Sequence, residues 1–129
     1  MSELSVKKTI ETNLDDAIER IKKALAERGF GILTRIDMHK KIKEKIGKDM
    51  EPVVILGACN PNLAYEAYQR NSDVAGLLPC NAVLREIAPG TISVELTKPS
   101  SLMTILNTQE LVDLAGKADE LISSALDSI

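Results

Sequence analysis

The strongest constraint in this chain is one uninterrupted apolar run, Val53–Cys59, which ends directly at Asn60-Pro61. A short run of this kind is typical of a strand covered on both faces. It is much shorter than a membrane-spanning helix, which needs about 18 apolar residues. Asparagine is a preferred N-cap and proline is favoured at the first helical position. The run therefore predicts a buried strand followed at once by a helix, in a chain that does not span a membrane.

The other patterns alternate between strands and helices along the whole chain. Strand patterns cover residues 4–11, 30–36, 76–88 and 91–97, and helical stripes cover 12–28, 38–46, 61–69 and 107–129. Pro79 lies inside the predicted strand over residues 76–88 and indicates a bulge or an edge strand there. Asn107 is expected to cap the last helix. We expect a single α+β domain over residues 1–129, with helices on one face of a mainly antiparallel sheet.

Charge and aromatic content argue against a nucleic-acid partner. The chain has 16 Lys and Arg against 19 Asp and Glu, which gives a net charge of −3. Its aromatic side chains are Phe30, Tyr65 and Tyr68, too few for a base-stacking platform. No apolar leader segment is visible near residue 1, so a cytoplasmic location with reduced thiols is expected.

Two Cys-Asn pairs, Cys59-Asn60 and Cys80-Asn81, are the main candidates for chemistry. Cys59 ends the buried strand where a helix begins, and first-turn amides with the helix dipole favour an anion there. A thiolate in that position is expected to have a depressed pKa and raised reactivity. Asn81 follows Cys80 in a strand pattern, where its amide needs hydrogen-bond partners if it is buried.

A metal site is a further alternative, with Cys59, Cys80 and His39 as candidate ligands. A closed structural zinc site needs four ligands, so it would require a carboxylate or a second subunit. Each candidate also has a purely structural explanation: the cysteines as small buried apolar residues, Asn60 as a cap, and His39 as a solvent-facing residue near the start of a helix. The sequence assigns no cofactor.

Three linked motifs resemble domain-of-unknown-function family 302. They are Gly31-Ile32-Leu33-Thr34-Arg35-Ile36-Asp37, Ile55-Leu56-Gly57-Ala58-Cys59-Asn60-Pro61 and Gly76-Leu77-Leu78-Pro79-Cys80-Asn81. The resemblance covers nearly the whole chain. The family usually has an acid where this chain has Arg35, so no catalytic role is carried over to that position.

The resemblance implies a fold like half of the TATA-box-binding protein, β-α-β(4)-α with small inserted helices. It also implies a small homodimeric cytosolic protein of prokaryotes, and it implies no activity. The likeness to a DNA-binding fold is an analogy of architecture alone.

Three hypotheses for the function remain open at this point. The first is a homodimeric binding module that holds a small molecule, an anion or a metal ion at Cys59, Asn60, Cys80 and Asn81. The second is a thiol enzyme or redox protein with Cys59 as its nucleophile. The third is a purely structural interaction protein, because every candidate residue has a structural explanation.

Overall fold

The computed structural model describes residues 4–106 and 109–129 of the chain. Strands and helices alternate in the β-α-β(4)-α order with short helices inserted, which confirms the predicted α+β class. The elements are β1 (Ser5–Glu11), α1 (Leu14–Ala26), β2 (Gly31–Asp37), α2 (Met38–Ile46), β3 (Val53–Cys59), α3 (Pro61–Arg70), the 3₁₀ helix η1 (Ser72–Leu77), β4 (Cys80–Ala88), β5 (Thr91–Thr97), α4 (Pro99–Met103), the 3₁₀ helix η2 (Thr104–Leu106) and α5 (Val112–Asp127). None of the helices in the described part of the chain is long and apolar enough to cross a membrane.

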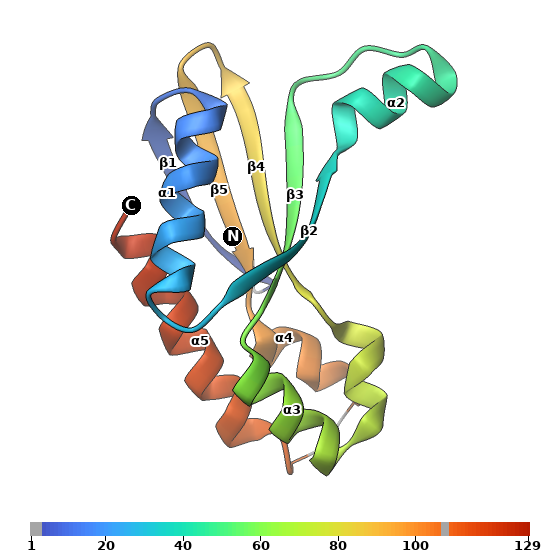
Figure 1. Cartoon of the computed structure of the whole chain (residues 1–129), viewed down its shortest axis with the longest axis vertical. Helices are drawn as coiled ribbons and strands as arrows, with labels where there is room; N and C mark the ends of the chain where they lie inside the picture. The colour runs from blue at the N-terminus through green and yellow to red at the C-terminus, as the bar shows by residue number, and fades with distance from the viewer. Residues whose placement is uncertain (1–3, 107–108) are drawn as a thin grey trace.

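The five strands form one antiparallel sheet in the order β1-β5-β4-β3-β2 (Figure 1). Strand β3 lies between β2 and β4, and most of its residues are buried, as its continuous apolar run predicts. In the pairing of β3 with β4, Ala58 lies opposite Cys80. The C-terminal end of β3 and the start of β4 are therefore neighbours at one end of the sheet.

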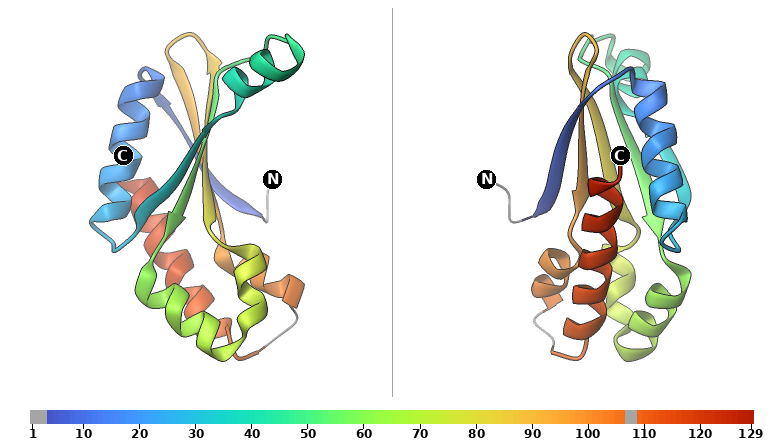
Figure 2. Two further views of the ribbon diagram at one scale, coloured as in Figure 1. Left: turned by 45° about the vertical axis from the view of Figure 1, so that its right-hand side comes forward. Right: turned by 90° about the vertical axis from the view of Figure 1, so that its left-hand side faces the viewer.

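Helices α1 and α5 cover one face of the sheet (Figure 2). Helix α1 begins after Asn13, whose side chain accepts a hydrogen bond from the backbone N–H of Asp16 at 2.8 Å, as a capping residue does. Its apolar stripe and that of α5 pack on the inward-facing residues of the strands. The main core comprises Ile10, Ala17, Ile18, Ile21, Ala24, Leu25, Phe30, Val54, Leu56, Ala58, Ala82, Leu84, Ile92, Val94, Leu96, Ile122, Ala125 and Leu126.

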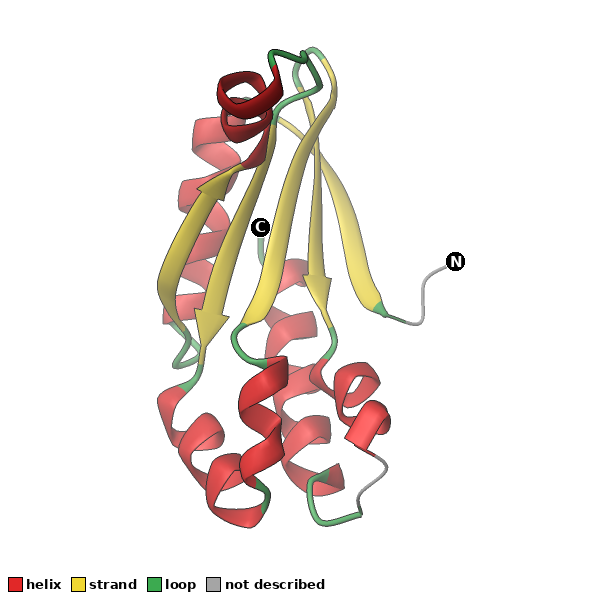
Figure 3. Ribbon diagram, turned by 90° about the vertical axis from the view of Figure 1, so that its right-hand side faces the viewer, coloured by secondary structure: helices red, strands yellow, loops and turns green. Residues whose placement is uncertain are grey.

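Within residues 4–106 and 109–129, no helix lies over the opposite face of the sheet (Figure 3). Its centre carries polar contacts between strands: Glu95 accepts hydrogen bonds from Ser5 Oγ at 2.6 Å and from Arg85 Nη1 at 2.7 Å. Next to them, Ile55 and Val83 lie opposite each other and are half-buried. This face is therefore the mixed, solvent-facing side of an antiparallel sheet.

Below the sheet, α3, η1 and α4 form a helical layer against the first half of α5 (Figure 3). A second, smaller core of Ala67, Val74, Leu111 and Leu114 holds this layer together. Helix α5 is long enough to contribute to both cores, because its later residues Ile122, Ala125 and Leu126 belong to the main one. The molecule therefore has two apolar cores that share one helix.

Two sequence predictions need correction. The predicted strand over residues 76–88 begins only at Cys80, because residues 72–77 form η1 and Pro79 has no N–H to donate to a strand ladder. The last helix begins at Val112. Its predicted cap, Asn107, lies outside the described residues.

Helix α2 projects from the body of the domain at the edge of the sheet (Figure 1). None of its side chains is buried, and Ile46 is 63% exposed. Asp37 stands at its N-cap position without a side-chain capping bond, and Gly47 ends it in the left-handed conformation. The apolar side of α2 is thus only partly covered, with Ile42 half-buried and Ile46 exposed.

Substitution of Gly57 tests the close packing of the lower sheet. An added methyl group at Gly57 would lie 2.8 Å from Cγ of Pro79 and also against Oγ1 of Thr34. We expect Gly57→Ala to lower the free energy of unfolding by about 1–3 kcal/mol in urea titrations. Gly31→Ala is the matched control because nothing lies within 4 Å of its added methyl group, and it should cost nothing. Equal stability of the two variants would contradict the packing argument.

Candidate functional site

A cavity of about 50 Å³ lies where the lower end of the sheet meets the helical layer. Residues of both cores line it, and so do the sulfur-containing side chains of Cys59, Cys80 and Met103. The remaining described lining residues are uncharged: Phe30, Ala58, Asn60, Leu63, Ala64, Ala67, Val74, Leu78, Pro99, Leu111, Leu114, Ala115 and Ala118. The site is therefore apolar, and its polar character comes from two thiols and one amide.

The pairing of β3 with β4 places both cysteines at this cavity. Cys80 is the first residue of β4 and is buried, and Cys59 is the last residue of β3 and is half-buried. They are neighbours because Ala58, next to Cys59, lies opposite Cys80. The structure thus brings together two residues that lie far apart in the sequence, and both are free thiols.

Asn60 borders the same cavity, but its side chain is engaged in structural bonds. Its Oδ1 accepts a hydrogen bond from the N–H of Leu63 at 3.2 Å, which caps α3 as predicted. Its Nδ2 donates to the carbonyl oxygen of Arg28 at 3.4 Å. Asn60 thereby joins the start of α3 to the turn after α1. Its amide hydrogens are directed to that turn, so it offers little to an oxyanion.

Burial raises the pKa of both thiols, so the predicted depression of the Cys59 pKa is wrong. For Cys59 the cause is the loss of water around the sulfur. For Cys80, burial first, then the nearby Cys59 and Asp119, raise the pKa to about 11. At the N-terminus of α3, Pro61 has no N–H, and the amides of Leu63 and Ala64 are already bonded to Asn60, so these residues give the sulfur no donor. Both side chains are neutral thiols at neutral pH.

Asn81 is the one member of the predicted Cys-Asn site that does not lie at the cavity. It is opposite Gly57 in the pairing of β3 with β4 and is exposed. Side chains alternate along a strand, so Asn81 points to the helix-free face while Cys80 points to the cavity. The Thr34 and Pro79 side chains cover Gly57 on that face. The space beside Gly57 is thus occupied by side chains of this chain.

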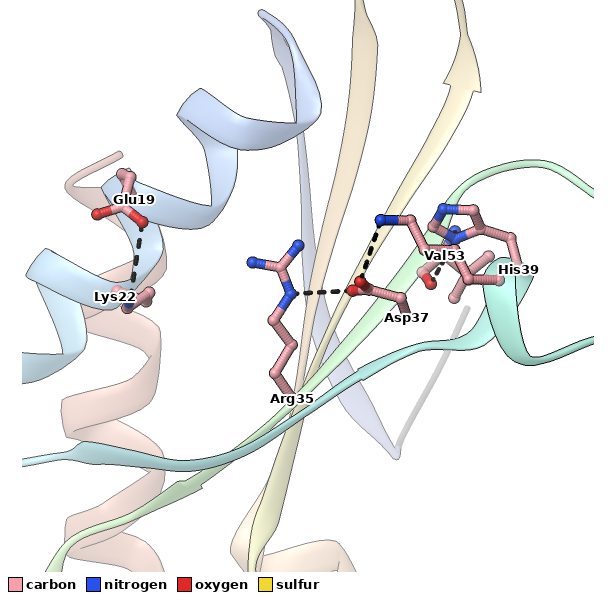
Figure 4. A network of polar contacts seen from close by, with 7 residues as sticks. Glu19, Lys22, Arg35, Asp37, His39 and Val53 are labelled. Carbon is pink, nitrogen blue, oxygen red and sulfur yellow. Dashed lines mark hydrogen bonds and ion pairs between the residues drawn. The ribbon is translucent and has the colours of Figure 1, made fainter. Parts of the chain in front are cut away.

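His39 lies at the opposite end of β3 from Cys59. Its Nδ1 accepts a hydrogen bond from the N–H of Val53 at 3.0 Å and lies 3.1 Å from the carbonyl oxygen of the same residue (Figure 4). Val53 and Cys59 are the two ends of β3, so about 20 Å of strand separates this histidine from the thiols. His39 therefore neither activates Cys59 nor joins the cysteines in a metal site of a single chain.

The residues around His39 form a separate polar network (Figure 4). Arg35 Nε donates to Asp37 Oδ1 at 2.9 Å, and Lys40 Nζ lies 3.6 Å from Asp37 Oδ2. The hydrogen bond from Arg35 is the main cause that lowers the pKa of Asp37, although partial burial opposes it. Asp37 is thus held as a carboxylate by two cations, which explains why its side chain does not cap α2.

The described residues offer no conventional metal centre. Within residues 4–106 and 109–129, no group of three His, Cys, Asp or Glu side chains is placed to hold a metal ion. Sequence reasoning did not include Met103 or Asp119 among the candidate residues. Met103 reaches the cavity because α4 packs on α5, and Asp119 lies near Cys80 without belonging to the described lining. Local patterns reveal neither arrangement.

Comparisons with known proteins agree with this architecture. The profile of the family described as "Domain of unknown function DUF302" matches residues 6–129. A crystal structure of an uncharacterized conserved DUF302 protein from Bacillus stearothermophilus is similar to this chain, with a TM-score of 0.90 and 28% identity over 98% of each chain. No curated protein matches the chain.

Alkylation tests whether the thiols are as unreactive as their burial indicates. With iodoacetamide at neutral pH we expect slow modification of the native protein, slower at Cys80 than at Cys59. Each rate should keep rising with pH, because the pKa of each thiol lies above the ordinary value of a cysteine. For Cys80 the raised pKa is about 11. Mass spectrometry of the peptide that contains each cysteine gives the two rates. The control is the protein unfolded in denaturant, in which both thiols should react with the pKa of a free cysteine, about 8.5. A rate at Cys59 that levels off below about pH 7.5 would contradict this assignment.

Proposed function

The chain belongs to the DUF302 family, and on the geometry of its cavity we propose that it is a binding protein for a very small, weakly hydrated ligand. The ligand contacts the thiols of Cys59 and Cys80. The observation that carries this proposal is one apolar cavity bordered by two free, neutral thiols from neighbouring strands.

The size of the cavity limits what it admits. Its volume of about 50 Å³ is well below the roughly 150 Å³ of an apolar cavity that accepts benzene. A ligand of a few heavy atoms or a single ion therefore fits without rearrangement of the walls. Larger metabolites would require α3 or α4 to move away from α5.

The chemistry of the walls limits the ligand further. An anion would enter a cavity whose described lining residues carry no positive charge, and burial of an unpaired charge is costly. Of the ligand classes open from the sequence, a small neutral molecule or a soft metal ion therefore fits better than an anion. The thiol enzyme fits poorly, because its nucleophile would be protonated and the lone histidine of the chain lies at the other end of β3.

The exposed helix α2 favours a second candidate function, an interaction protein that forms a homodimer. Residues 38–48 contain five lysines and one glutamate, whereas the chain as a whole has a net charge of −3. Outside this segment a second copy therefore carries a net negative charge opposite to that of α2, and the exposed Ile46 offers apolar area to bury. This candidate is compatible with ligand binding at the cavity, which lies at the opposite end of the sheet.

Xenon is a suitable probe of the cavity because small apolar cavities of proteins bind it. We expect xenon to shift the methyl NMR signals of cavity residues in a saturable manner. Ala64→Leu, which fills the cavity from α3, should abolish the shifts. Ala26→Leu, on the exposed side of α1, is the matched control and should retain them. Shifts that do not saturate, or that persist in Ala64→Leu, would show that the cavity does not accept a ligand.

The oligomeric state tests the second candidate separately. We expect light scattering after size-exclusion chromatography to give the mass of a dimer for the wild-type chain. Ile46→Glu, which places a charge on the apolar side of α2, should shift the protein to monomer without changing its circular dichroism. Lys23→Glu, at an exposed position on α1 outside the proposed contact, provides the control for added negative charge. A wild-type monomer at about 100 μM would remove this candidate, since stable dimers associate below that concentration.

A further inference from the structure

We propose that the ligand of this cavity is a single soft monovalent metal ion, Cu(I), held by the sulfur atoms of Cys59, Cys80 and Met103. The inference rests on the proposed function, because it names the ligand of the same cavity. It is supported by the three sulfur-containing residues that line the cavity, the chemistry of the other lining residues and the balance of charge.

Three sulfur-containing side chains from three different elements border the one cavity. Cys59 ends β3, Cys80 begins β4, and Met103 ends α4. The other two methionines in the described residues, Met38 and Met50, are 37% and 38% exposed and lie in or near α2, at the other end of the sheet. Three of the five sulfur-containing residues in the described part of the chain therefore lie at the cavity.

This donor set selects one class of metal ion. Thiolate and thioether sulfur are soft ligands that favour Cu(I), whereas Ca²⁺ and Mg²⁺ require several oxygen ligands. A structural Zn²⁺ site takes four nitrogen, oxygen or thiolate ligands, and the described lining includes no histidine or carboxylate beside the two cysteines. A volume of about 50 Å³ suits a single ion that has lost its water.

The charge balance favours a monovalent ion with one thiolate. When Cu(I) binds, one thiol releases its proton to solvent and the resulting thiolate cancels the positive charge of the ion. The thioether then coordinates as a neutral donor, whereas the second cysteine stays a protonated thiol and contacts the ion only weakly, because a full cysteine ligand is a thiolate. The apolar walls then border a neutral complex. A second thiolate would give the complex a net negative charge beside apolar walls, and burial of an unpaired charge is costly. One proton released per ion is the expected stoichiometry.

Anaerobic competition with the chromophoric Cu(I) chelator bicinchoninate measures the affinity directly. We expect one Cu(I) per chain. Of Cys59→Ser and Cys80→Ser, the variant that removes the thiolate should weaken binding by about a hundredfold or more, and the other, like Met103→Leu, by about tenfold. Met103→Leu nearly conserves volume and should stay folded, which circular dichroism verifies. Met50→Leu, which removes an exposed thioether away from the cavity, is the matched control and should bind as the wild type does.

Two further measurements identify the mode of binding. X-ray absorption should show copper surrounded by sulfur alone. The affinity should rise about tenfold per pH unit between pH 6 and 8, as expected for the release of one proton. Copper bound through nitrogen or oxygen, or equal affinity in the cysteine variants and the wild type, would overturn the assignment.

The failure of this inference is distinguishable from failure of the proposed function. If xenon occupies the cavity but Cu(I) is not bound at one equivalent, the cavity remains a binding site and its ligand is not a metal ion. If neither xenon nor Cu(I) binds, both proposals are wrong. Zn²⁺ should give no one-to-one complex in the same assay, and binding of Zn²⁺ with equal affinity would contradict the selectivity argued from the donor set.

Discussion

The antiparallel pairing of β3 with β4, with Ala58 opposite Cys80, determines the arrangement of the lower half of the molecule. Both strands meet the helical layer at this end, because β3 continues into α3 and β4 is entered from η1. The helices therefore begin and end beside one another and must pack below the sheet. The two cysteines are neighbours for the same reason, so the candidate site is a direct consequence of strand register.

Helix α5 then accounts for the cavity between the two cores. Its first half packs with α3, η1 and α4, and its second half packs with α1 and the sheet. The walls of the cavity come partly from each core, as Phe30 and Ala58 on one side and Val74 and Leu111 on the other show. Small residues of α5, including Ala115 and Ala118, face this junction and leave it incompletely filled. Larger side chains at those positions would join the two cores into one.

The sequence patterns predicted those parts of the structure that depend on local order. The apolar run of β3, the cap at Asn60 and the α+β class with its β-α-β(4)-α order all follow from periodicity, capping and family resemblance. The patterns failed where a distant contact decides the outcome. The thiol pKa of Cys59 depends on burial by α3 and the helical layer, and the role of Met103 depends on α4 packing against α5. The start of β4 was misplaced because a strand-like run of apolar residues forms η1 instead.

The raised pKa values of the thiols bear on the kind of function such a site performs. A nucleophilic cysteine requires a stabilised thiolate, and this cavity stabilises the neutral thiol through its apolar walls and the negative charge of Asp119. When a cation replaces the thiol proton, the sulfur remains part of a neutral group. The apolar walls of the cavity accommodate such a group better than a free thiolate. The raised pKa that makes Cys59 and Cys80 poor nucleophiles also makes a bound cation compete with the thiol proton, so nucleophilic reaction and ion binding at this site both become more favourable as the pH rises.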